Sequence, residues 1–453
     1  MTSPILLWLR QDLRLSDQAA LTAAVAEGPV VPVYILDDET PREWQIGAAQ
    51  RWWLHHSLAV LDANLRTKGS RLILRRGRSE TELAKLAQET GARRVHAIRH
   101  AEPWWRNAER AVGEALDLVL HEGNHLAPLG AIRNGGGAPY KIYSPFWRAL
   151  RETMPPSGPV LAPKTIPAPT RWPRSDKLED WALLPTRPNW AARFGENTTP
   201  GEEGARRQLA DFVAGVGSYE TRRNLPSEEG SSRLSPHLHF GELSPTTVWH
   251  SLAGERHAEK FLKELAWRDF SANLIRLLPT YGSESGNSKL DSLQWRSSQA
   301  DLFAWRQGRT GYPIVDAGMR QLWATGWMHN RVRMIAASFL VKHLLIDWRE
   351  GARWFWDTLI DADYGNNSVN WQWIAGTGVD ANMFARIMAP LLQSEKFAAA
   401  DYVRTWVPEL AHLPDEAIHD PDEHGCRPAD YPVKIIGHRE GRARALAALA
   451  ATR

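Results

Sequence analysis

Apolar residues in the first 130 positions form short continuous runs separated by stretches of helical spacing. The runs are typical of buried strands, and the stretches between them have the length and period of helices. The predicted strands are Ile5 to Leu9, Val30 to Leu36, Leu72 to Leu74, Val95 to Ile98 and Leu118 to Leu120, and the predicted helices are Gln18 to Ala26, Ala48 to Thr67, Thr81 to Thr90 and Ala108 to Leu116. This alternation predicts a doubly wound parallel sheet, a Rossmann-like α/β domain, over residues 1–130. No GxGxxG sequence follows the first strand, so the usual dinucleotide fingerprint is absent.

The pattern changes twice further along the chain. Prolines concentrate between Met154 and Pro200 without a sustained period, and we predict a Pro-rich interdomain linker over residues 131–200. From 201 to 453 apolar residues recur at helical spacing, which predicts an all-helical second domain. The helices expected there include Ala205 to Val213, Ser244 to Ala253, Ala258 to Leu277, Ile314 to Ala324, His329 to Leu344, Trp348 to Leu359 and Arg442 to Ala450.

Composition supports this division and narrows the class of protein. A chain of 453 residues with 43% hydrophobic and 24% charged residues is long enough for two globular domains and is not disordered. The lone Cys426 excludes an internal disulfide and a Cys-rich metal site. The apolar run Ile5 to Leu9 is short and is followed by Arg10, so we expect no signal peptide, no membrane span and a cytoplasmic protein. A net charge of +3 permits a nucleic-acid partner without requiring one, and 22 Trp exceed the 9 Tyr and 11 Phe together.

Three polar segments could carry chemistry. In the loop from Tyr219 to Pro236, serines ahead of a helix could cradle a phosphate or could simply cap the helix. Glu264 and Trp267 share one helical face, as do Asn330, Arg333 and Met334, and each set could line a pocket or lie on an ordinary helix surface.

The segment from Asp361 to Trp373 is rich in small and polar residues and is expected to form turns. Its two aspartates lack an EF-hand pattern, so we predict no metal site. GxSxG, Walker A and CxxC sequences do not occur, which disfavours hydrolases, NTPases and thiol redox enzymes.

Taken together, these segments resemble the DNA photolyase and cryptochrome family over nearly the whole chain. The opening stretch Leu7 to Asp17 is similar to that family's first strand and turn. More specific are the segments 311–320 (GYPIVDAGMR), 326–334 (GWMHNRVRM) and 394–397 (SEKF) through 406–409 (WVPE). The resemblance implies an N-terminal domain that holds an antenna chromophore and a helical domain, residues 201–453, that binds FAD and DNA.

The resemblance also assigns cofactor-binding residues. FAD would be held by Tyr219, Ser231, Ser232, Leu234, Ser235, Arg268, Arg333, Asp361, Asp363 and Asn367. Within this set Arg333 would pair with Asp361 beside the isoalloxazine ring, and Asn367 would face flavin N5. Plant cryptochromes usually carry Asp at the last position, and a neutral Asn fits an enzyme that works with reduced FADH⁻.

The implied reaction is light-driven repair of cyclobutane pyrimidine dimers, by a bacterial class I or class III photolyase. The dimer would be flipped out of DNA into a pocket formed by Glu264, Trp267, Asn330, Met334 and Trp373, and phosphates would be bound by Arg223, Arg331, Arg386 and Lys396. The (6-4) photolyases carry His at the positions of Asn330 and Met334, so that lesion is disfavoured. The expected partner is UV-damaged DNA, single- or double-stranded, and a monomer is expected.

Tryptophans have two expected uses beyond the lesion pocket. Trp295, Trp348 and Trp371 match the family's chain for reducing oxidised flavin, and most of the others, including Trp323, Trp327 and Trp354, are expected in the core. The antenna is expected near Leu36 to Thr40 and Ala101 to Trp105, as methenyltetrahydrofolate or, alternatively, 8-hydroxydeazaflavin. The alternative function is a cryptochrome-type blue-light photoreceptor without repair activity.

Overall fold

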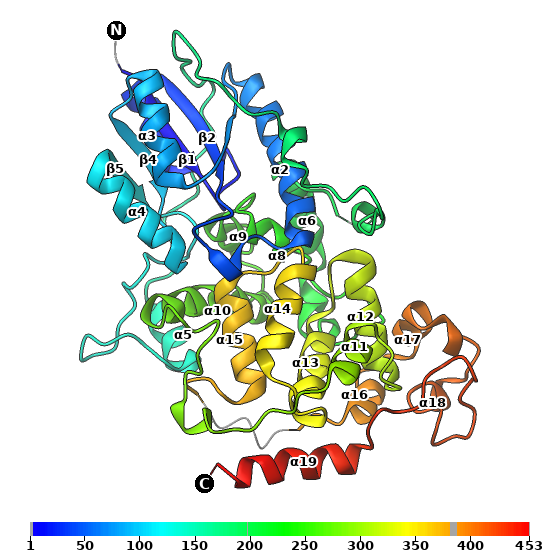
Figure 1. The fold of residues 1–453 in the computed structure, drawn as a ribbon. Coiled ribbons are helices and arrows are strands. Elements are labelled where there is room, and N and C mark those ends of the chain that lie inside the picture. The colour runs from blue at the N-terminus through cyan, green and yellow to red at the C-terminus, as the bar shows by residue number, and fades with distance from the viewer. Residues whose placement is uncertain (1–2, 197, 381–386, 453) are drawn as a thin grey trace.

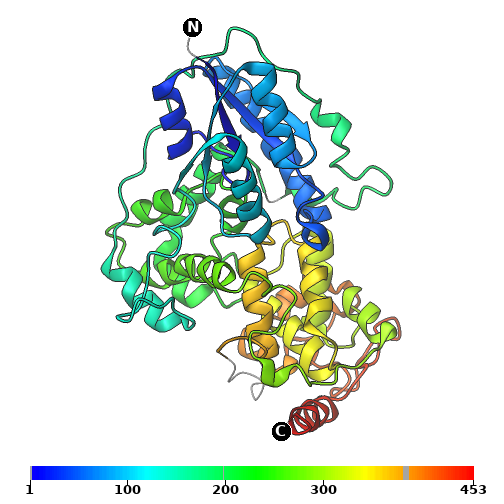
Figure 2. The same cartoon turned by 60° about the vertical axis from the view of Figure 1, so that its left-hand side comes forward.

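The chain is arranged as an α/β unit packed on a larger helical unit (Figure 1 and Figure 2). The structure is a computed structural model that describes residues 3–196, 198–380 and 387–452. Among these residues, no helix combines the length and the hydropathy that a membrane crossing requires.

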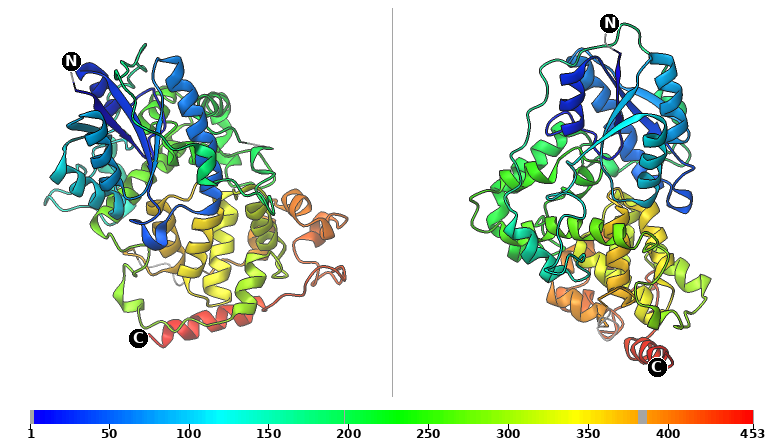
Figure 3. Two further views of the ribbon diagram at one scale, coloured as in Figure 1. Left: turned by 45° about the horizontal axis from the view of Figure 1, so that its top comes forward. Right: turned by 90° about the vertical axis from the view of Figure 1, so that its left-hand side faces the viewer.

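Five parallel strands form one sheet in the order β3-β2-β1-β4-β5. They are β1 (Ile5–Leu9), β2 (Val30–Leu36), β3 (Ile73–Arg76), β4 (Arg94–Ile98) and β5 (Asp117–His121). Alternate residues of β1 pack on opposite faces: Leu7 lies in the core beside α1 (Ala19–Glu27) and α2 (Ala48–Thr67), whereas Trp8 lies beside α3 (Ser79–Thr90) and α4 (Pro103–Ala115). Helices therefore cover both faces, as Figure 3 shows, and the predicted doubly wound sheet is confirmed.

The connector between the units does more than link them. It first forms α5 (Tyr143–Glu152), whose Phe146 and Leu150 are buried in the core of the helical unit. It then runs back over the sheet, where the Ile166 amide donates to the Lys68 carbonyl at 2.9 Å. Residues 131–200 were expected to be a linker, yet they contain this helix because its apolar residues recur at helical spacing.

The helical unit is built around α15 (Tyr364–Ala375), against which α10 (Glu259–Leu277), α13 (Asn330–Ser338) and α14 (Trp348–Thr358) each pack. The predicted helix from His329 to Leu344 is α13 continued by a π-helix, Phe339–His343. The other helices are α6 (Glu202–Gly215), α7 (Tyr219–Arg222), α8 (Ser235–His239), α9 (Pro245–Ser251), α11 (Gln299–Arg306), α12 (Pro313–Thr325), α16 (Pro390–Lys396), α17 (Ala400–Trp406), α18 (Asp415–Ile418) and α19 (His438–Ala450).

The stretch from Asp361 to Trp373 is helical over most of its length, and the expectation of turns was wrong there. The Asp363 carboxylate accepts a hydrogen bond from the Asn366 amide at 2.7 Å and caps α15. Gly365 lies so close to Ser271 of α10 that a Cβ would sit 3.2 Å from the Ser271 carbonyl carbon. Packing between α10 and α15 thus stabilises a helix that begins with weak helix formers.

Candidate functional site

A partly buried ion pair lies in the helical unit. Arg333 of α13 contacts both oxygens of Asp361, at 3.1 and 2.9 Å, and Ser235 at the start of α8 donates to the same carboxylate at 2.6 Å. Arg333 also donates to the Met328 carbonyl at 2.7 Å, which fixes the direction of its guanidinium. The structure therefore forms the Arg333 and Asp361 pair expected beside the flavin.

Two polar side chains of this region are accessible. Ser235 is exposed although Leu234 and Pro236 on either side of it are buried, and Asn367 on α15 is only half-buried. The Asn367 amide donates to the Ala352 carbonyl of α14 at 3.0 Å, so its orientation is fixed by a neighbouring helix. Hydroxyl, amide and carboxylate groups suit the polar edge of a flavin.

The serine loop before α8 is ordered by its own hydrogen bonds. Ser232 Oγ accepts from the Leu234 amide at 3.3 Å, and Gln208 donates to the Ser232 carbonyl at 3.0 Å. Ser231 and Ser232 are both half-buried, and Tyr219 is buried beside Phe212 and Phe261. The loop leaves hydroxyls accessible, which fits phosphate binding.

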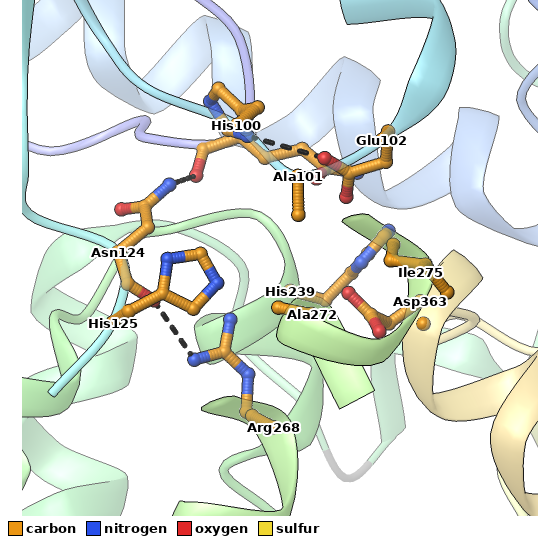
Figure 4. Close-up of a pocket in the computed structure, with 12 residues that line it drawn as sticks. His100, Ala101, Glu102, Asn124, His125, His239, Arg268, Ala272, Ile275 and Asp363 are labelled. Carbon is orange, nitrogen blue, oxygen red and sulfur yellow. Dashed lines mark hydrogen bonds and ion pairs between the residues drawn. The ribbon is translucent and has the colours of Figure 1, made fainter. Parts of the chain in front are cut away.

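A small cavity lies between the two units (Figure 4). Residues from both units line it: His100, Glu102 and His125 from the α/β side and connector, and His239, Arg268 and Asp363 from the helical side. Figure 4 shows Arg268 reaching toward the Asn124 carbonyl, which it contacts at 3.3 Å.

The electrostatics of this cavity are those of a polar binding site. Burial and the nearby Asp363 raise the pKa of Glu102 to about 7, while burial lowers the pKa of His239 to about 4 and, together with Arg268, that of His125 to about 3. Glu102 Oε2, His125 Nδ1 and His239 Nδ1 are buried without a hydrogen-bond partner. Such unmatched polar atoms fit a heteroaromatic ligand that offers both donors and acceptors.

The residues expected to contact a lesion lie on three helices, α10, α13 and α15. Glu264, Trp267, Met334 and Trp373 are half-buried and Asn330 is exposed. Glu264 forms an ion pair with Arg223, whose guanidinium also lies 5.2 Å from the centre of the Tyr219 ring. Burial lowers the pKa of Arg223, but the hydrogen bond that Arg223 donates to Glu264 and the nearby Tyr219 and Glu220 together outweigh burial, and the net pKa is raised.

Cations gather beside Glu264. Arg331 contacts Asn224 at 2.6 Å and Met334 Sδ at 3.7 Å, and burial and the nearby Arg223 lower its pKa. Arg331 lies 4.6 Å and Lys396 lies 5.5 Å from the centre of the Phe397 ring. The structure thus brings three of the four predicted phosphate-binding residues to this region, and Arg386 lies outside the described residues.

The predicted electron-transfer tryptophans lie around α14. Trp371 and Trp348 are buried, and Trp295 is half-buried. A Cβ at Gly351, one turn after Trp348, would lie 2.1 Å from the Trp371 ring, so this glycine admits the indole against α14. The Trp371 ring also contacts the Trp305 ring, with centres 6.4 Å apart.

Two features were not found from the sequence. Tyr143 of α5 stacks on Trp267. The Tyr-x-x-Phe-Trp spacing within the supposed linker could have indicated helix α5, though not the contact with Trp267. Trp323 was expected in the core but is 51% exposed and stacks on Trp354, because α12 presents it to solvent.

Comparison with known proteins places this architecture in a family. A family model described as the FAD binding domain of DNA photolyase matches residues 261–451, and one described as DNA photolyase matches residues 5–169. The chain is 46% identical to the deoxyribodipyrimidine photo-lyase of Agrobacterium fabrum, over 100% of this chain and 98% of that protein. It is 34% identical to cryptochrome-1 of Arabidopsis thaliana, over 97% of this chain and 69% of that protein.

Structural similarity agrees with these matches. The crystal structure of a bacterial class III photolyase from Agrobacterium tumefaciens has a TM-score of 0.95 and 45% identity, covering 100% of this chain and 98% of that one. The chain belongs to the DNA photolyase family. Its helical unit carries the family's FAD-binding domain, which confirms the predicted family, the predicted fold class and the predicted FAD.

Proposed function

We propose that this chain is a class III deoxyribodipyrimidine photolyase, which uses light to reverse cyclobutane pyrimidine dimers in DNA. The observation that carries the proposal is the cluster of Glu264, Arg223, Arg331 and Met334, beside which Trp267 presents an indole. A carboxylate, an aromatic plane and a set of cations suit a planar, hydrogen-bonding base attached to phosphates. The class assignment follows the similarity to the Agrobacterium class III structure.

The chain's own residues bind and orient the lesion. Glu264 exchanges Arg223 for the imide group of a flipped pyrimidine, while Trp267 and Trp373 pack against the dimer. Asn330 at the start of α13 offers an amide to the same bases. When bound, reduced FAD supplies one electron to the dimer on illumination and recovers it after the cyclobutane ring has opened.

Other residues keep the cofactor in place. Arg333, Asp361 and Ser235 form the ion-paired edge toward which the isoalloxazine ring would lie, and Asn367 would face it with a neutral amide. Asp363, Arg268, Tyr219, Ser231, Ser232 and Leu234 complete the proposed cofactor-binding set. The antenna is proposed to bind near Leu36 to Thr40 and Ala101 to Trp105, with methenyltetrahydrofolate as the ligand and 8-hydroxydeazaflavin as the alternative.

Binding to DNA relies on charge. Arg223, Arg331 and Lys396 lie close to Glu264 or Phe397 on one side of the helical unit and are the proposed phosphate contacts. Because phosphate contacts release counterions, affinity for DNA falls as salt rises. We propose that the protein acts as a monomer.

The competing function is that of a cryptochrome-type photoreceptor, which the 34% identity to cryptochrome-1 brings into consideration. Illumination distinguishes the two. Purified protein with chemically reduced flavin is mixed with an oligonucleotide that contains one thymine dimer and is kept in light or in darkness. Restoration of intact thymines only in the light supports repair, whereas equal dimer content in both samples refutes it.

A further inference from the structure

Tyr143 lies flat on one face of Trp267. The two ring centres are 3.9 Å apart and the planes differ by 9°. The Tyr143 hydroxyl donates to the Lys263 carbonyl, one helical turn before Trp267 on α10. Burial raises the pKa of Tyr143 well above its ordinary value, so the hydroxyl keeps its proton and remains a donor.

A third ring completes the support of this indole. Phe270 meets Trp267 edge-on at 5.4 Å and 85°, and it meets Tyr143 edge-on at 5.7 Å and 79°. Phe146, one turn after Tyr143 on α5, contacts Phe270 at 5.5 Å. Stacked and edge-to-face arrangements are the favourable geometries for aromatic pairs, so the contacts fix the plane of the Trp267 ring.

The stack has a consequence for what Trp267 can bind. One face of its ring is covered by Tyr143, yet Trp267 is only half-buried, so the remaining face and edge are accessible. A side chain that is already held in place loses little conformational entropy when a ligand packs on it. The support comes from α5, a rigid helix, and not from an extended part of the connector.

We propose that Tyr143 is a positioning residue for lesion recognition: it holds the Trp267 indole in the orientation that packs against the pyrimidine dimer. This inference rests on the proposed repair function. It assigns a role in recognition to α5, which the sequence placed in a linker. The Tyr143 hydroxyl holds the Tyr143 ring against α10, and the stacked ring holds the Trp267 indole in place.

The test compares three variants by the affinity of each for DNA with and without a single thymine dimer. Tyr143→Leu removes the aromatic plane, Tyr143→Phe keeps the plane and removes the hydroxyl, and Trp267→Ala removes the positioned indole. We expect Y143L to bind dimer-containing DNA about two- to twelvefold more weakly, the range that corresponds to one aromatic pair. Binding of undamaged DNA and FAD content stay unchanged, and Y143F stays within about twofold of the wild type.

A double-mutant cycle distinguishes positioning from a general structural effect. If Tyr143 acts through Trp267, adding Y143L to W267A causes no further loss of dimer affinity. Equal loss in both backgrounds, or dimer affinity of Y143L equal to that of the wild type, overturns the inference. If Y143L binds no FAD, Tyr143→Met replaces it in the same cycle.

Failure of the proposed function has a different outcome. If the wild type itself does not discriminate dimer-containing from undamaged DNA, repair is refuted and the role of Tyr143 with it. If the wild type discriminates, W267A does not, and Y143L behaves as the wild type, the repair function stands and only the inference about Tyr143 fails.

Discussion

Replacing Arg223 by alanine tests whether the cation that pairs with Glu264 in the free protein moves to DNA in the complex. In the free protein the two side chains form an ion pair and are 11% and 34% exposed, respectively. The net pKa of Arg223 is raised, so the side chain is a cation throughout the working pH range. If the lesion replaces Arg223 at Glu264, the guanidinium becomes available to a phosphate.

The size of the effect follows from counterion release. Each phosphate contact on duplex DNA contributes about 0.9 to the slope of log affinity against log salt. Removing one contact makes the slope shallower by that amount. Between about 50 and about 200 mM salt, the wild type should therefore lose about 3.5-fold more affinity than R223A does.

Fluorescence anisotropy of a labelled, dimer-containing duplex measures this slope at several salt concentrations. Arg66→Ala is the matched control, because Arg66 also pairs with a carboxylate, Asp62 at 2.7 Å, but lies on α2 of the α/β unit. The control should reproduce the wild-type slope. A slope for R223A that equals the wild-type slope would refute the reasoning, since it would mean that Arg223 stays with Glu264 when DNA binds.

Three further predictions follow from the site. Asp361→Asn leaves the Arg333 guanidinium without its counter-charge, which should lower the free energy of unfolding in urea by about 3 kcal/mol and reduce FAD content; unchanged values for both would contradict the ion-paired site. Glu102→Gln should be more stable than the wild type above pH 7 and equally stable below about pH 4, where the carboxyl is protonated in both the folded and the unfolded chain. The wild type loses stability as the pH rises toward 7 because the pKa of Glu102 is raised to about 7 in the folded protein; thermal unfolding at both pH values checks this. Trp371→Phe should slow the light-dependent reduction of oxidised FAD, which is measured by visible absorbance, yet leave repair by chemically reduced protein intact. Photoreduction as fast as in the wild type would show that Trp371 does not carry the electron.

Much of the fold could be predicted because local pattern and tertiary packing agree there. The helix from Ala48 to Thr67 was predicted with the bounds it has, and the strands of the sheet were placed within a few residues. These segments have a clear apolar period, which is the strongest signal that a single sequence contains.

The remaining features depend on contacts between distant residues. The first turn of helix α15 contains Gly365, Asn366 and Asn367, whose low helix propensity hid a helix that an Asp363 cap and packing on α10 stabilise. The ion pair of Arg223 with Glu264 and the stack of Tyr143 on Trp267 join separate elements, so spacing along the chain gave no sign of either. Family resemblance supplied the candidate residues, and their geometry came from the structure.

The measurement that tests the central claim most directly is the number of thymine dimers restored per protein molecule under continuous light. Chemically reduced protein is given excess oligonucleotide with one cyclobutane dimer, and parallel samples contain a (6-4) photoproduct or are kept in darkness. The account predicts several cyclobutane dimers restored per protein in the light, none in darkness, and no repair of the (6-4) lesion. Equal dimer content in light and darkness would contradict it.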